Sequence, residues 1–125
     1  MKYSQKGAEL MIDIFGEEAT DHVHKQLGEI YPPFLDFLTS TVDDLYSDTT
    51  LDIKTKEIIV LASLITQKDT KPQIKTHLKA ALRAGVTPKE VLAMILHLTM
   101  YVGFPATLNA VNIAKETFEE MGVGV

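Results

Sequence analysis

The sequence of 125 residues contains no cysteine. The chain can therefore form no disulfide bond, hold no zinc–thiolate site and supply no thiol for catalysis. An excess of positive charge is missing as well: 12 Lys and Arg stand against 17 Asp and Glu, so the net charge is −5. Proteins that follow phosphate backbones or anionic lipids carry clustered basic residues. We expect no nucleic-acid partner and no membrane partner.

Long apolar runs and the common cofactor signatures are also absent. No run reaches the about 18 apolar residues that cross a bilayer, and the first ten residues, MKYSQKGAEL, lack the apolar core of a signal peptide. We expect no transmembrane segment and a cytoplasmic location. The chain has no P-loop, no GxGxxG and no GxSxG motif, so neither a nucleotide cofactor nor a serine-hydrolase site is indicated.

What the sequence does contain is apolar residues at helical spacing along most of its length. The hydrophobic fraction is 46%, which favours a folded core, and no window alternates with the period of a strand. We predict an all-α fold of six or seven helices, in a single domain over residues 1–125. The predicted breaks fall at Gly16, Pro32–Pro33, residues 47–50, residues 67–71, Gly85 and Gly103.

The signals for helix starts and ends are clearest between residues 70 and 105. Thr70 with Gln73, and Thr87 with Glu90, have the spacing of capping boxes, in which each side chain bonds the backbone N–H of the other residue at a helix start. Gly85, between the two predicted helices, supplies the left-handed conformation that ends a helix. The sequence therefore predicts two helices joined by a tight turn.

The last helices are apolar over more than one face. A small monomer has little interior in which to bury such helices, so we expect a homo-oligomer. A compact monomer with loosely patterned helices is the alternative. In the final helix, the residues predicted to pack inward are Ala106, Leu108, Ala110, Val111, Ile113, Ala114 and Phe118.

Glu57 is the most informative single residue. Its helical neighbours Ile53, Leu61 and Leu64 are all aliphatic, so the carboxylate interrupts an apolar stripe. A buried carboxylate is costly unless it is hydrogen-bonded or paired. We therefore expect either a structural partner that ties helices together or a position beside a wet cavity.

Two histidines lie on apolar faces on opposite sides of the Gly85 turn. His77 shares its face with alanines, which leave room for a neighbouring helix or a small ligand, and His97 is flanked by Met94 and Tyr101. An imidazole near a carboxylate is a common arrangement for acid–base catalysis at neutral pH. The candidate catalytic residues are thus His77, Glu57 and His97, with satisfied core histidines as the alternative.

The same three residues would also make a set of two histidines and one carboxylate for a metal ion. No HExxH motif or other short ligand spacing accompanies them. We therefore expect no metal and no other cofactor.

Three segments together resemble the carboxymuconolactone decarboxylase family. The resemblance covers about residues 51–113, and its specific features are Glu57, His77, the Gly85 turn with Glu90, and Gly103–Ala106 with Asn109. The segments read LDIKTKEIIVLASLI, HLKAALRAGVTPKEVLAMILH and YVGFPATLNAV.

This resemblance implies an alkylhydroperoxidase D-like helical bundle that assembles as homotrimers or homohexamers, with Glu57 and His77 in sites near subunit contacts. One branch of the family decarboxylates a carboxylated muconolactone on the β-ketoadipate route of aromatic breakdown, without a cofactor. The other branch reduces peroxides or disulfides through a Cys-x-x-Cys pair, which this chain replaces with residues 70–73, TKPQ, so that activity is excluded. Two departures from the decarboxylase pattern are Lys56 in place of arginine and His97 in place of glutamine.

The implied function is the cofactor-free decarboxylation of a small carboxylated lactone of the 4-carboxymuconolactone type. In this interpretation His77 delivers a proton, Glu57 orients His77, and His97 hydrogen-bonds the substrate. Two alternatives stay open. The chain is a non-catalytic ligand-binding or structural member whose Glu57 and His77 tie helices together, or it is an enzyme for another small lactone or β-keto acid.

Overall fold

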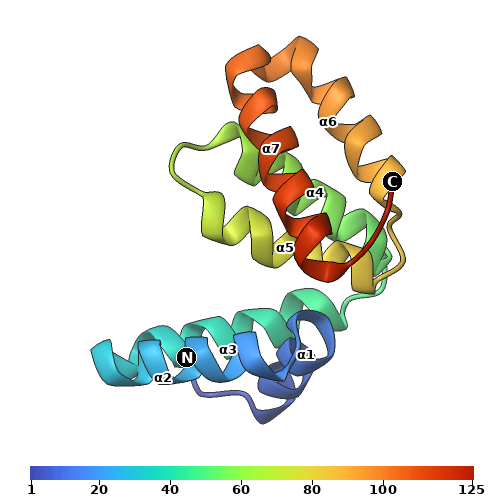
Figure 1. Cartoon of the computed structure of the whole chain (residues 1–125). Helices are drawn as coiled ribbons and strands as arrows, with labels where there is room; N and C mark the ends of the chain where they lie inside the picture. Colours follow the sequence, from blue (N-terminus) through green and yellow to red (C-terminus); the bar gives the residue numbers. More distant parts are fainter. The chain divides into compact units, whose positions relative to one another are not determined.

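The computed structural model describes all residues from 1 to 125 and contains seven α-helices and no strand (Figure 1). The prediction of an all-α fold with six or seven helices is confirmed. The helices are α1 (Gln5–Phe15), α2 (Glu17–Ile30), α3 (Pro32–Ser47), α4 (Ile53–Thr66), α5 (Lys71–Arg83), α6 (Pro88–Val102) and α7 (Phe104–Met121).

The chain divides into two compact units, residues 1–51 and residues 52–125. The predicted single domain stays a prediction. No helix combines the length and the apolarity that a membrane crossing requires.

Unit 1 is built on a close contact between α1 and α3. Ser4 caps α1, since its hydroxyl accepts a hydrogen bond from the Gly7 N–H at 2.9 Å and donates one to Asp43 at 2.9 Å. The Ser4 N–H donates to the hydroxyl of Thr39, which is fully buried. A Cβ atom placed on Gly7 would stand 1.8 Å from the Thr39 carbonyl oxygen. Only glycine permits α1 to approach α3 so closely.

Unit 2 consists of α4, α5, α6 and α7, and α4 packs against the other three. All four helices contribute to one apolar core, so α4 and α5 are held rigidly side by side. The buried residues of this core are Leu61, Ile65, Ile74, Leu78, Ala81, Val86, Val91, Ile95, Ala110, Ile113, Ala114 and Phe118.

Of the three helix start and stop signals predicted in unit 2, two are correct. Thr87 and Glu90 form the capping box of α6, with bonds of 3.1 and 2.9 Å. Gly85 has φ of +102°, and the following turn closes with a bond from the Val86 N–H to the Ala81 carbonyl. The box predicted at Thr70 was wrong: the Thr70 hydroxyl donates instead to the Leu64 carbonyl, at 2.6 Å. Thr70 thus fastens the loop to the end of α4.

The predicted inner face of α7 was partly wrong. Leu108 and Val111 are 51% and 39% exposed, whereas Thr107 and Thr117 are buried. Buried positions at 107, 110, 114 and 117 follow one helical stripe, and the two aliphatic residues lie outside it. The prediction used hydrophobicity alone and therefore chose the two aliphatic residues over the two threonines. The threonines can be buried because their hydroxyls donate to carbonyls one turn earlier.

A pair of glycine substitutions tests the packing of unit 1. Gly7→Ala should destabilise the protein by about 1–3 kcal/mol, because the new methyl group forces α1 away from α3. Gly28→Ala is the matched control, since nothing lies within 4 Å of its Cβ position in α2. This control should gain up to about 1 kcal/mol from helix propensity. Denaturant unfolding followed by circular dichroism measures both, and a Gly7→Ala protein as stable as wild type would contradict the packing described.

Candidate functional site

Glu57 and His77, which lie 20 residues apart in the sequence, meet in unit 2. His77 Nδ1 is 2.8 Å from Glu57 Oε1. Glu57 belongs to the second turn of α4 and His77 to the middle of α5. The structure thus brings together two of the three predicted site residues.

The pair is buried on one side and accessible on the other. The Glu57 side chain is 0% exposed, whereas the His77 side chain is 21% exposed. Glu57 shares the buried stripe of α4 with Leu61 and Ile65, as the prediction that it interrupts an apolar face requires. Removing a carboxylate from water costs several kcal/mol unless hydrogen bonds replace its hydration. The bond to His77 provides part of that replacement.

This bond relates the tautomer of His77 to the charge of Glu57. When Glu57 is ionised it has no proton to give, so Nδ1 donates and carries the hydrogen. In the neutral ring, the second nitrogen, Nε2, is then a lone-pair acceptor. In the charged ring, Nε2 is a donor whose positive charge lies beside Glu57. The pair can accept or release a proton at Nε2 without breaking its own hydrogen bond.

Two of the alanines beside His77 are covered by helix packing. Ala80 and Ala81 are 1% and 0% exposed, and α5 packs on both α4 and α7. Access to His77 is therefore confined to the part of its ring that the packed helices leave uncovered.

His97 lies apart from the pair. It is an exposed residue of α6, and its ring is 5.7 Å from the ring of Tyr101. No hydrogen bond joins it to Glu57 or His77. The role assigned to His97 from the sequence stays a prediction. No group of three or more His, Asp or Glu side chains is placed to hold a metal ion.

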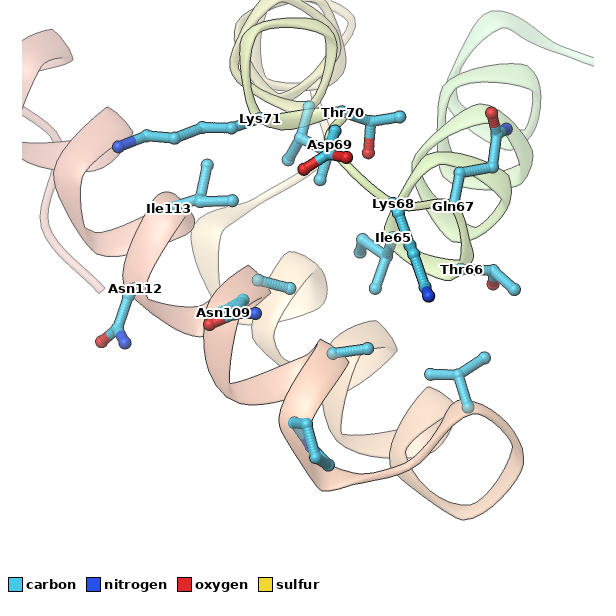
Figure 2. Close-up of a pocket in the computed structure, with 15 residues that line it drawn as sticks. Ile65, Thr66, Gln67, Lys68, Asp69, Thr70, Lys71, Asn109, Asn112 and Ile113 are labelled. Atoms are coloured by element: carbon cyan, nitrogen blue, oxygen red, sulfur yellow. The ribbon is translucent and has the colours of Figure 1, made fainter.

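A pocket of about 750 Å³ opens elsewhere in unit 2, between the loop that joins α4 to α5 and the first half of α7 (Figure 2). Its lining includes neither Glu57 nor His77. It does border the same two helices, since Ile65 of α4 and Ile74 of α5 form part of its wall. The sequence did not predict this pocket, because residues 67–71 have only the pattern of a polar loop.

Comparisons with known proteins agree on one family. The model of the carboxymuconolactone decarboxylase family matches residues 32–116. A 4-carboxymuconolactone decarboxylase of Acinetobacter baylyi is 27% identical over 98% of this chain and 90% of its own length. A nitrosuccinic acid decarboxylase of Metarhizium robertsii is 23% identical over 93% of this chain and 81% of its own. An uncharacterised 15.0 kDa protein of Paracoccus denitrificans is 31% identical, over 56% of this chain and 53% of its own.

The tautomer of His77 can be measured directly. We expect long-range ¹H–¹⁵N NMR spectra of the neutral ring to show Nδ1 protonated and Nε2 unprotonated, because Nδ1 donates to Glu57. His22, an exposed histidine of α2, serves as the internal comparison without this bond. A neutral His77 with its hydrogen on Nε2 would contradict an ionised Glu57 that accepts this bond.

Proposed function

The chain belongs to the carboxymuconolactone decarboxylase family, and from that membership we propose that it removes CO2 from a small carboxylated lactone of the 4-carboxymuconolactone type. Two relatives whose names describe decarboxylases of small acids support a decarboxylase activity. The observation that carries the proposal is the hydrogen bond between Glu57 and the partly exposed His77, which lies inside the matched region.

The chemistry needs no cofactor if the substrate accepts the electrons itself. Cleavage of the bond to the carboxylate releases CO2 and leaves an electron pair on the adjacent carbon, where the carbonyl system of the substrate delocalises it. One proton must then be added to a carbon over which this pair is delocalised. A site with apolar walls assists the first step, because a carboxylate that leaves as neutral CO2 no longer bears the cost of a buried charge.

His77 is the proposed proton donor. Its charged ring would pass the Nε2 proton to the substrate carbon and keep the Nδ1 proton on the Glu57 side. A new proton from solvent then restores the ring through its exposed part, and the sum of the reaction is one carboxylate plus one proton giving CO2 and product. Glu57 acts through His77, so it is a positioning residue in this scheme: it fixes the ring and stabilises its positive charge.

His97 would enter the site only through assembly. It stands on a strongly exposed apolar surface of α6 and α7, and we propose that this surface is the contact between subunits of a homo-oligomer. His97 would then reach a substrate at or near a subunit boundary. The exposed residues of the surface are Leu96 at 76%, Met100 at 83%, Tyr101 at 70%, Phe104 at 65% and Leu108 at 51%.

A non-catalytic role has one observation in its favour. The same bond joins α4 to α5, as a purely structural tie would. The two functions separate on stability: Glu57→Gln and His77→Gln variants that unfold or dissociate indicate a structural pair. Variants that fold normally and lose only turnover indicate a catalytic one.

Turnover of 4-carboxymuconolactone by a His77→Gln variant tests the assignment. We expect its rate to fall about 10²–10⁴-fold, the range for loss of a general acid. Loss of substrate absorbance and release of CO2 measure the rate, and His22→Gln is the control for loss of a histidine outside the site. Undiminished turnover in folded His77→Gln would reject His77 as the proton donor.

If the wild-type protein does not turn over this lactone, nitrosuccinic acid is the next substrate to try, because a relative is named for it. A folded protein that acts on neither acid would reject the substrate class and favour the non-catalytic role.

Assembly through the α6–α7 surface is tested by Met100→Glu. A charge at this exposed apolar position should break the subunit contact, so the particle mass should fall from a multiple of 13.9 kDa to 13.9 kDa itself. Lys89→Glu introduces the same side chain at the polar start of the same helix and should leave the mass unchanged. Sedimentation analysis measures both variants. A monomeric wild type, or an unaltered Met100→Glu oligomer, would overturn the proposed interface.

A further inference from the structure

The pocket beside the α4–α5 loop has an apolar floor. Ile65, Ile74 and Ile113 line it from three helices and are 4%, 6% and 9% exposed. Its volume of about 750 Å³ lies within the range of small-molecule sites. An apolar group that covers this floor gains about 25 cal/mol for each Å² removed from water. The floor therefore favours an aliphatic or aromatic body of a few carbons.

Two opposite charges stand at the rim, on consecutive residues of the loop. Lys68 and Asp69 both line the pocket, and neither has a hydrogen bond or ion-pair partner within the chain. Lys71, the other cation of the lining, is by contrast held by Glu116 at 3.2 Å. Figure 2 shows the Lys68 side chain extending toward the α7 side and the Asp69 carboxylate turned toward the same opening. Asp69 has φ of +59°, a conformation that asparagine and aspartate tolerate better than other residues with side chains.

The opposite wall adds a group that suits either charge. Asn109 of α7 lines the pocket across from the loop (Figure 2). Its amide makes no hydrogen bond within the chain, and it offers both donors and an acceptor. Above its apolar floor the pocket thus presents one cation and one anion that have no partner in the chain, and the amide of Asn109 on the α7 wall.

We propose that this pocket binds a free α-amino acid with an apolar side chain. The carboxylate pairs with Lys68, the ammonium pairs with Asp69, Asn109 bonds either group, and the side chain covers Ile65, Ile74 and Ile113. A simple carboxylic acid would leave Asp69 facing a ligand of its own charge, and a simple amine would leave Lys68 in the same position. Only a zwitterion matches both rim charges at once. The pocket lies outside the Glu57–His77 pair, so it is a second site and does not depend on the proposed decarboxylase activity.

Three probes of one shape separate the contributions of the charges. Leucine carries both charged groups, 4-methylpentanoate lacks the ammonium, and 3-methylbutylamine lacks the carboxylate. We expect saturable ¹H–¹⁵N NMR shifts on adding leucine to the whole protein, centred on residues 65–74 and 102–113. Each analogue should bind about fivefold more weakly than leucine, the effect of one lost charge pair at an exposed site.

Two substitutions connect each charge of the ligand to its partner. Lys68→Gln should weaken leucine about fivefold and should not weaken 3-methylbutylamine, since that probe has no carboxylate to lose. Asp69→Asn, which keeps the backbone conformation available, should weaken leucine about fivefold and should not weaken 4-methylpentanoate. Lys115→Gln removes an exposed lysine of α7 outside the pocket and should bind leucine as wild type does.

The outcomes decide the proposal without reference to enzymatic activity. Leucine binding at the pocket, weakened in both rim variants and not in Lys115→Gln, supports it. Leucine that causes no saturable shift there, shifts that map to other residues, or analogues that bind as tightly as leucine would each overturn it. Unchanged spectra for residues distant from the pocket verify that the variants remain folded.

Discussion

A single buried carboxylate determines how unit 2 must be arranged. Glu57 lies in the apolar stripe of α4 with no exposure to solvent, so its charge has to be compensated by neighbours inside the unit. The 2.8 Å bond to His77 provides one such neighbour and fixes α5 against α4. The common core formed with α6 and α7 keeps the two helices in that position. The hydrogen bond that the buried Glu57 carboxylate needs and the burial of apolar side chains in the core thus both favour the same packing of α5 against α4.

This arrangement also gives the pair its chemical capacity. Glu57 lies 2.8 Å from one nitrogen of His77, and the His77 side chain is 21% exposed. The same hydrogen bond joins α4 to α5 and holds the ring on which the proposed reaction depends. The proposed amino-acid site lies at the C-terminal end of α4 and the N-terminal end of α5, so its ligand would contact both helices that carry the pair. Ile74, in the lining of that site, lies one turn before His77.

Much of the fold could be predicted because its signals are local. Gly16, Gly85 and Gly103 all adopt positive φ where helices end, and the Thr87 capping box opens α6 as expected. Glu57 was identified because one charged residue in an aliphatic stripe needs a partner, although the sequence could not show which of two histidines it meets. That choice depends on which helices pack together. Near Glu57, α4 is covered by α5, which carries His77, whereas His97 lies on the exposed face of α6.

The remaining errors arise where tertiary contacts override local chemistry. Thr70 has the spacing of a cap, but its hydroxyl is nearer to the Leu64 carbonyl of the preceding helix. Leu108 and Val111 are apolar and exposed, a pattern that the sequence of one chain cannot assign to a core or to an interface. The pocket escaped notice for a related reason, since Lys68, Asp69 and Asn109 come from segments about 40 residues apart and only the fold places them around one opening.

The most direct test of the account is where the proton in the product comes from. Decarboxylation of 4-carboxymuconolactone in D2O should place one deuterium on the carbon that is protonated after CO2 leaves, on a single face, because one fixed His77 ring delivers it. In His77→Gln the residual product should carry deuterium on both faces at a much lower rate. Deuterium on one face at the wild-type rate in that variant would contradict the claim that the Glu57–His77 pair performs the reaction.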